Sequence, residues 1–191
     1  MNYYDENAKE FFDGTVDADM SSHHMKFLGQ MPENGSILDA GCGSGRDAKI
    51  FKDLGYEVSA IDGSEEMCKL ASEFSGIDVK HMQFQEIDFA NEFDGIWASA
   101  SLLHVPSDEL DLVLDNLKNS LKEDGIFYAS FKYGDFEGER NGRYFNDLTE
   151  STAKELFEKN GFEVTETWIT SDSRKGREDE KWTNIIVKKI K

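Results

Sequence analysis

The chain has 191 residues, of which 38% are hydrophobic and 12% aromatic, enough apolar material for one sizeable core. Asp and Glu number 39 against 21 Lys and Arg, so the formal net charge is -18. Proteins bind nucleic acids through Lys and Arg that neutralise phosphates, so this balance argues against an RNA or DNA partner.

The sequence shows no targeting or metal-binding pattern. Its first residues are polar and acidic, and no apolar run approaches the ~20 residues that span a bilayer, so we predict no signal peptide and no membrane partner. Cys42 and Cys68 lack the spacing of a zinc or redox pair, so no metal is expected. Free cysteines are typical of a reducing compartment, which favours a cytoplasmic location.

Strand-like and helix-like segments alternate from residue 36 onward. In chain order, the patterns predict helical segments within 1–35, a strand over 36–40, a helix over 46–54, a strand over 57–61, a helix over 64–74, a short strand over 78–81, a strand over 93–98, a helix over 106–121, a strand over 125–131, a helix over 149–160, and strands over 162–170 and 182–187. Ser64, Ser107 and Thr149 are expected to cap their helices.

This alternation predicts a parallel sheet with helices on both faces. Two strands follow the last helix with only the loop 171–181 between them, so they form a hairpin, and one edge strand should run antiparallel to the rest. No repeat or linker divides the chain. We therefore expect a single domain over 1–191, with a helical cap over 1–35 and a core over 36–191.

A glycine-rich turn follows the first predicted strand, with glycine at positions 41, 43 and 45. Alternate glycines let the backbone turn sharply and let a ligand approach without Cβ atoms in the way. The next helix then presents free N–H groups at its start. The second strand ends in Asp62, whose carboxylate can accept hydrogen bonds from ribose hydroxyls. The pattern thus predicts a nucleotide-type ligand at the carboxyl ends of the strands.

The run Ile-Leu-Asp-x-Gly-x-Gly-x-Gly over 37–45 resembles the cofactor motif of class I S-adenosylmethionine-dependent methyltransferases. The dinucleotide fingerprint has the spacing G-x-G-x-x-G instead, so a nicotinamide-dependent dehydrogenase is the less favoured alternative. The resemblance extends from 37 to 187 and includes the terminal hairpin. It implies an α/β, Rossmann-like three-layer sandwich with a mostly parallel seven-stranded sheet of order 3-2-1-4-5-7-6, an antiparallel last strand and a helical cap at the amino terminus.

The resemblance also implies a cofactor site for S-adenosylmethionine. Asp39 and the turn would face the methionine part, Asp62 the ribose, and residues 98–102 the region of the sulfonium. The adenine would be lined by Gly63, Met67, Gln83 and Phe84. The residues expected to bind the cofactor are Asp39, Gly41, Cys42, Gly43, Ser44, Gly45, Arg46, Asp62, Gly63, Met67, Gln83, Phe84 and Ala98. Two of these residues have an alternative role: Phe84 can be a simple core-packing residue, and Arg46 can form a surface pair with Asp47.

The run Gly-Ser-Gly-Arg-Asp over 43–47 resembles a subset of bacterial small-molecule methyltransferases, including those of tellurite resistance. Arg46 would then pair with the cofactor carboxylate or with an acidic partner. A general base is needed only when the acceptor carries a weakly acidic proton. His104, just past the fourth strand, is the candidate for that role, although it can also cap the next helix or pack under its loop. The other histidines, at 23, 24 and 81, are interpreted as incidental.

Acceptor specificity is expected from the loop after the fifth strand and from the terminal hairpin. Basic residues are scarce in this chain, so Lys132, Arg143 and Arg174 suggest a pocket for an anionic acceptor. Tyr144 and Trp182 complete the expected acceptor site, with Tyr3 and Tyr4 as further walls or a lid. The alternative is that the basic residues only balance neighbouring acids.

The favoured function is methyl transfer from S-adenosylmethionine to a small, possibly anionic molecule. A protein or tRNA methyltransferase, a nicotinamide-dependent dehydrogenase and a non-catalytic cofactor sensor are the alternatives. The scaffold is used for many acceptors, so the sequence leaves the acceptor atom open, and the oligomeric state as well.

Overall fold

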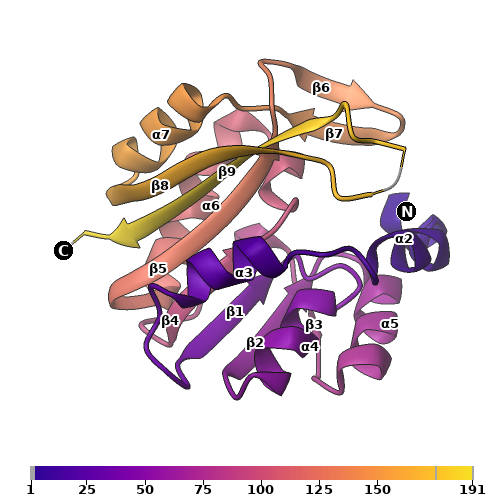
Figure 1. Cartoon of the computed structure of the whole chain (residues 1–191), viewed down its shortest axis with the longest axis horizontal. Coiled ribbons are helices and arrows are strands. Elements are labelled where there is room, and N and C mark those ends of the chain that lie inside the picture. The colour runs from indigo at the N-terminus through magenta and orange to yellow at the C-terminus, as the bar shows by residue number, and fades with distance from the viewer. Residues whose placement is uncertain (1–2, 175, 191) are drawn as a thin grey trace.

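The computed structural model describes residues 3–174 and 176–190 and contains a seven-stranded sheet of order β3-β2-β1-β4-β5-β9-β8 (Figure 1). The strands are β1 (Ser36–Ala40), β2 (Glu57–Asp62), β3 (Lys80–His81), β4 (Phe93–Ala98), β5 (Leu121–Lys132), β8 (Phe162–Ser171) and β9 (Lys181–Lys189). With β8 and β9 as the sixth and seventh strands of the prediction, this confirms the predicted order 3-2-1-4-5-7-6.

Strand directions correct one expectation. The pairs β1–β2, β1–β4, β2–β3 and β4–β5 are parallel, whereas β9 is antiparallel to both β5 and β8. The last strand β9 is therefore antiparallel, as predicted, but it lies inside the sheet, and the edge strand β8 runs with the rest, so the expectation of an antiparallel edge strand was wrong. Burial explains the order, because residues 183–187 of β9 are all buried while β8 alternates between exposed and partly covered positions.

Helices cover both faces of this sheet (Figure 1). They are α1 (Tyr3–Glu6), α2 (Ala8–Thr15), α3 (Ser21–Leu28), α4 (Arg46–Asp53), α5 (Glu65–Ser75), α6 (Ser107–Ser120) and α7 (Glu150–Lys159), with short 3-10 turns η1 (Phe84–Glu86) and η2 (Leu102–His104). One core joins Phe27 of α3 and Phe51 of α4 to Trp97 of the sheet. The other joins α6 and α7 to the opposite face, for example through Leu114 and Phe157.

The cap helices α1 and α2 lie beside α5, away from α3, which crosses the sheet face (Figure 1). A short side-chain bond fixes α1 there, since the Ser64 hydroxyl donates to Asp5 at 2.6 Å. Ser64 also caps α5 by accepting from the backbone N–H of Met67, as predicted. The cap is thereby connected to the helix that follows the second strand.

A two-stranded sheet, β6 (Glu137–Arg140) and β7 (Arg143–Asn146), was not predicted. It follows β5, where the sequence was interpreted as an irregular loop. The connecting residues Asn141 and Gly142 both have positive φ, 52° and 75°, the backbone of a tight hairpin turn. The dipeptide Asn-Gly was the sequence signal for this hairpin, and it brings Arg143 and Tyr144 beside η2.

Two local predictions differ in outcome. Thr149 caps α7 by accepting from the N–H of Thr152, as predicted. Ser107 is the first residue of α6 and Pro106 occupies the capping position, so the prediction of a Ser107 cap was wrong. The N–H of Ser107 instead donates to Glu137 on the new hairpin.

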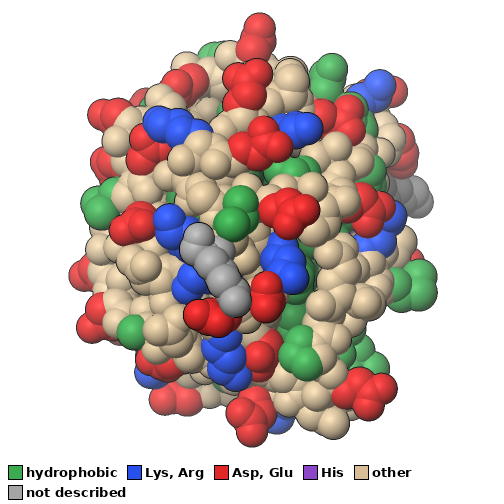
Figure 2. Space-filling model, turned by 90° about the vertical axis from the view of Figure 1, so that its left-hand side faces the viewer, with side chains coloured by type: hydrophobic (Ala, Val, Ile, Leu, Met, Phe, Trp, Pro, Cys, Tyr) green, Lys and Arg blue, Asp and Glu red, His purple; other side chains and the backbone are tan. Residues whose placement is uncertain are grey.

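The surface matches the acidic composition. On the face shown in Figure 2, Asp and Glu side chains are spread over the whole view with Lys and Arg interspersed among them. Among the residues that the structure describes, no helix is long and apolar enough to cross a membrane.

Candidate active site

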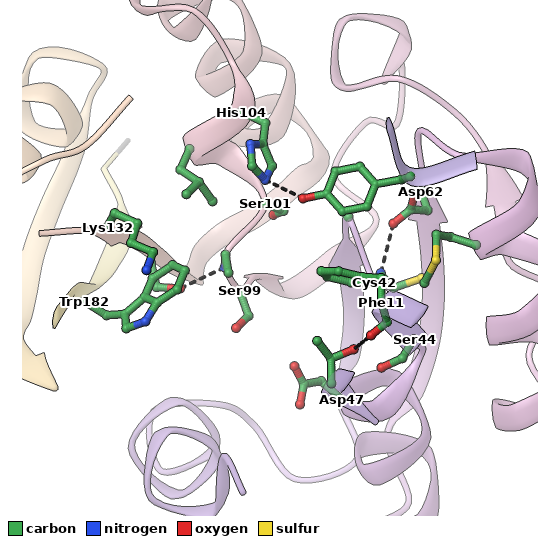
Figure 3. A pocket seen from close by; sticks show the side chains of 18 of the residues that line it. Phe11, Cys42, Ser44, Asp47, Asp62, Ser99, Ser101, His104, Lys132 and Trp182 are labelled. Atoms are coloured by element: carbon green, nitrogen blue, oxygen red, sulfur yellow. Dashed lines mark hydrogen bonds between the residues drawn. The ribbon is translucent and has the colours of Figure 1, made fainter. Parts of the chain in front are cut away.

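A cavity of about 450 Å³ opens at the carboxyl ends of the parallel strands (Figure 3). The glycine turn after β1 and Asp62 at the end of β2 line one side of it. Lys132 at the end of β5 and Trp182 at the start of β9 line another side, and Figure 3 shows them across the cavity from Asp62 and Cys42. Residues from the cap, among them Phe11 of α2, complete the wall.

The glycine turn needs its three glycines for different reasons. Gly41, Gly43 and Gly45 have φ values of 78°, 54° and 74°, which L-residues with side chains rarely adopt. A Cβ at Gly41 would lie 2.5 Å from the Ser101 side chain. A Cβ at Gly45 would meet Ala71 of α5, so Gly45 allows α4 and α5 to pack closely and is not among the residues that line the cavity.

Asp39 places a buried carboxylate at the cavity. It lines the cavity, is buried, and its Oδ2 has no hydrogen-bond partner among the described residues. Burial, with the nearby charge of Asp47, raises the pKa of Asp39 well above its usual range. A cationic ammonium group bound beside it would satisfy this oxygen, so Asp39 fits the amino group of S-adenosylmethionine.

Asp62 connects the glycine turn to the start of α5. Its Oδ2 accepts from the N–H of Gly43 and its Oδ1 from the N–H of Ser64, both at 2.9 Å. Burial raises the pKa of Asp62. Each carboxylate oxygen has a second lone pair, so the same side chain can also accept bonds from ribose hydroxyls.

The expected adenine residues gather at the same end. Gly63, Met67, Gln83 and Phe84 all line the cavity. Gln83 donates from Nε2 to the carbonyl of Gly63 at 2.9 Å, which holds the two segments together. Phe84 lines the cavity and also packs against the core, so its packing role is confirmed and its contact with the cofactor stays a prediction. Cys42 and Ser44 of the turn line the cavity too.

Arg46 forms an ion pair with Asp47. Its Nε and Nη2 donate to the two Asp47 oxygens, each at 2.8 Å, and its Nη1 donates to the carbonyl of Thr15 at 3.1 Å. Asp47 is buried and Arg46 is only partly exposed where it lines the cavity, so the interpretation as a surface pair was wrong. Because the guanidinium already has an acidic partner, its expected contact with the cofactor carboxylate has less support.

Two further side chains complete what we call the Asp47 cluster, formed by His24, Arg46, Asp47 and Trp97. The Nε2–H of His24 and the Nε1–H of Trp97 each donate to an Asp47 oxygen at 2.9 Å. Arg46 and His24 lower the pKa of Asp47 despite its burial. His24 therefore has a structural contact that the sequence did not indicate, and His23 beside it lines the cavity.

His104 is held in one tautomer. Its Nδ1 lies 2.6 Å from the carbonyl of Tyr144, which can only accept, so Nδ1 carries the hydrogen. Its Nε2 then accepts from the hydroxyl of Tyr4 at 2.7 Å. Burial lowers the pKa of His104 to about 4, so the ring is neutral at pH 7. His104 does not cap the next helix. It lines the cavity together with Tyr4, whose hydroxyl lies against its Nε2.

The residues expected to hold the acceptor divide into two groups. Lys132 lies over the Trp182 ring at 4.8 Å and pairs with Glu180, and burial lowers the pKa of Lys132 to about 8. Arg174 pairs with Asp172, at 2.9 Å and 2.6 Å, and the Trp182 indole donates to the same carboxylate.

Arg143 and Tyr144 form the second group, on β7 beside His104. Both line the cavity. The structure thus brings all five expected acceptor residues to one cavity, with Lys132, Arg174 and Trp182 at one place and the β7 pair at another.

The range 98–102, expected beside the sulfonium, meets the cavity in part. Ser99, Ala100 and Ser101 line the cavity, whereas Ala98 is fully buried in the core and is not among the lining residues. Cap residues also line the cavity, namely Tyr3, Tyr4, Phe11, Thr15, Ala18, Met20 and His23. These contacts depend on how the cap packs against the sheet, which a segment without a partner strand does not reveal in its sequence. Only Tyr3 and Tyr4 were suggested from the sequence.

Comparisons with known proteins relate the sequence and the fold to methyltransferases. Residues 37–125 match the family model described as a methyltransferase domain. An uncharacterized methyltransferase of Staphylococcus carnosus is 34% identical over 130 residues, which cover 64% of this chain and 63% of that protein. An uncharacterized methyltransferase of Schizosaccharomyces pombe is 39% identical over 70 residues, covering 36% of this chain and 47% of that protein. The alignments thus span less than two thirds of these relatives.

Among solved structures, the Burkholderia thailandensis 1,6-didemethyltoxoflavin-N1-methyltransferase, with S-adenosylhomocysteine bound, superposes with a TM-score of 0.77. It is 22% identical, and the match covers 98% of this chain and 84% of that one, so it shows the shared fold. Together, these comparisons show that residues 37–125 are similar to the methyltransferase domain and that the chain has the fold of an S-adenosylmethionine-dependent methyltransferase.

Proposed function

We propose that this protein transfers the methyl group of S-adenosylmethionine to a small, anionic molecule. The observation that carries the proposal is one cavity that contains the glycine turn with Asp39 and Asp62 and also Lys132 and Arg174. Its volume of about 450 Å³ lies in the range of small-molecule sites.

The cofactor supplies an electrophilic methyl group, so the protein mainly has to hold the acceptor in line and exclude water. Asp39 would hold the cofactor's ammonium group and Asp62 its ribose. Phe11 would cover the turn from the cap side, because its ring lies 3.3 Å from where a Cβ of Gly43 would be. The helix α2 would then shield the reacting groups from water on one side of the cavity, and the hairpin β6–β7 would do so on the other.

Two features support a small acceptor over a protein or a tRNA. Cap residues form part of the cavity wall, which narrows access for a macromolecule. The net charge of -18 repels RNA. The cations Lys132, Arg143 and Arg174 supply local positive charge within this acidic molecule, which supports an anionic acceptor.

Calorimetric titration with S-adenosylhomocysteine and with NAD tests the cofactor half of the proposal. Heat is expected with the first and not with the second, and the opposite result would contradict it. Methyl transfer is then followed with labelled S-adenosylmethionine and pairs of small molecules that differ only in charge, such as acids and their amides. Transfer that favours the acid of a pair supports the proposal, whereas cofactor binding without transfer to any small molecule would favour the sensor alternative.

A further inference from the structure

Arg143 differs from every other arginine of the chain. The sequence contains five arginines, and four of them pair with a carboxylate: Arg46 with Asp47, Arg140 with Asp147, Arg174 with Asp172 and Arg177 with Glu180. Arg143 forms no such pair with any described residue, although the chain contains 39 acidic side chains. A cation that lines a cavity without an acidic partner is suited to an anionic ligand.

The surroundings of Arg143 are aromatic. Its guanidinium lies over the rings of Tyr3, Tyr4 and Phe145, at 4.8 Å, 5.9 Å and 5.1 Å from their centroids. Its Nη1 donates to the Tyr4 hydroxyl at 3.3 Å, while its buried Nε has no partner among the described residues. A guanidinium that stacks on ring faces keeps its planar edge for hydrogen bonding, and that edge matches a carboxylate.

Carboxylates of the protein that line the same cavity are engaged elsewhere. Asp47 and Asp172 each pair with another arginine. Asp62 accepts two backbone N–H groups, and Asp39 lies beside the glycine turn, where it fits the cofactor's ammonium group. The positive charge of Arg143 is therefore not neutralised by an acidic side chain that lines the cavity.

We infer that Arg143 binds the carboxylate of a small aromatic carboxylic acid, whose ring packs against the aromatic side chains around it. Charge selects the carboxylate, and the flat rings of Tyr3, Tyr4 and Phe145 favour a planar ligand over an aliphatic one. The inference rests on the proposed function, because it assigns this anion to the methyl acceptor and not to the cofactor.

Benzoate and its neutral isostere benzamide are the probes, titrated by calorimetry with and without S-adenosylhomocysteine. The wild-type protein should bind benzoate at least about tenfold more tightly than benzamide. Arg143→Gln should reduce that preference to roughly twofold or less, and Arg143→Lys should keep part of it, since it retains the charge but not the planar fork. Arg177→Gln is the matched control, because Arg177 lines the same cavity but pairs with Glu180, and it should keep the full preference.

Four results would overturn the inference: equal binding of the two probes by the wild type, no binding of either, a preference that survives in Arg143→Gln, or an S-adenosylhomocysteine affinity that Arg143→Gln weakens about tenfold. The last result would assign Arg143 to the cofactor's own carboxylate. The wild-type comparison needs no variant, so a failure of Arg143→Gln to fold leaves the test intact. If S-adenosylhomocysteine does not bind while benzoate is preferred, the proposed function fails and the Arg143 site stands.

Discussion

His104 is a residue whose burial sets its protonation state. Its pKa is about 4 in the folded protein against 6.5 ordinarily, because burial disfavours the cation and Arg143 adds a like charge. The unfolded chain therefore binds this proton more readily. The stabilising contribution is complete above pH 6.5 and is lost as the pH falls towards 4.

We expect the free energy of unfolding to fall between these pH values by on the order of 1–3 kcal/mol more in the wild type than in His104→Gln. Denaturant unfolding at several pH values measures this. Comparison of the two proteins is needed because the raised pKa values of Asp39 and Asp62 act in the opposite direction. Parallel curves for the wild type and His104→Gln would contradict the expectation.

Asp47 is the acceptor for four donor groups from three different side chains. Asp47→Asn removes the buried charge that compensates the partly buried Arg46. Loss of one partner of a buried pair is costly because the other charge stays desolvated, so we expect a loss of about 3–5 kcal/mol in the free energy of unfolding.

Asp53→Asn is the matched control for this change. Asp53 lies on the same helix and pairs with Lys49, but its side chain is 61% exposed, so its replacement should change stability by less than about 1 kcal/mol. Denaturant midpoints compare the two variants. Similar midpoints would show that the Asp47 cluster contributes little to the fold.

At the level of elements, glycines in α2 and in the turn after β1 have opposite roles. Gly14 of α2 has no atom within 4 Å of an added Cβ, so Gly14→Ala should stabilise the protein by about 0.5–1 kcal/mol through helix propensity. Gly43 has φ 54°, and an added Cβ would lie 3.3 Å from Phe11. Gly43→Ala should therefore destabilise by about 1 kcal/mol and weaken S-adenosylhomocysteine binding.

Thermal unfolding and calorimetry on the two variants check this pair. A Gly43→Ala protein that binds as tightly as the wild type would show that the turn tolerates a side chain and that Phe11 moves aside. A destabilised Gly14→Ala would show that α2 packs against something at that position.

The elements also show which features follow from local sequence. The caps at Ser64 and Thr149 were predicted because a hydroxyl and a backbone N–H three residues later are local partners. The sheet order and the antiparallel last strand followed from the family resemblance and are confirmed. The expectation that this strand lies at the edge was wrong, because a terminal hairpin pattern alone does not determine which of its two strands is buried. The hairpin β6–β7 was not predicted, although Asn141-Gly142 is a local signal for it.

The candidate site shows a similar division. Asp39 and the turn were expected from the motif over 37–45 and Asp62 from the end of the next strand, and the structure places both aspartates and residues 41–44 of the turn at one cavity. The contacts of Tyr4 with His104 and of His24 with Asp47 join residues 100 and 23 positions apart. Periodicity and spacing carry no information on such pairs, because they depend on where the cap crosses the finished sheet. The roles of all these residues toward cofactor and acceptor stay predictions.

On the scale of the whole molecule, the cavity is assembled from segments distributed along nearly the entire chain. Tyr3 and Asn184 both line it, so the cap, the sheet and the terminal hairpin have to pack together before the site is complete. This is consistent with the predicted single domain over 1–191, which stays a prediction, as does the cytoplasmic location.

The net charge of -18 gives a prediction for the molecule as a whole. Like charges are closer together in the folded state than in the unfolded chain, so their repulsion destabilises the fold. Salt screens this repulsion over distances beyond about 10 Å at 0.1 M. Most ion pairs of the protein are exposed and contribute about 0–1 kcal/mol each, so their screening should not cancel the gain.

We therefore expect the melting temperature to rise by a few degrees, roughly 2–5 °C, between low salt and about 0.5 M NaCl. Glu73→Lys with Glu155→Lys replaces two exposed acids by bases and serves as the matched variant. Because it has less charge to screen, its melting temperature should start higher at low salt and respond less to NaCl. If both proteins respond equally, the salt effect comes from a source other than net charge, and a melting temperature that falls with salt would show that the surface ion pairs outweigh the repulsion.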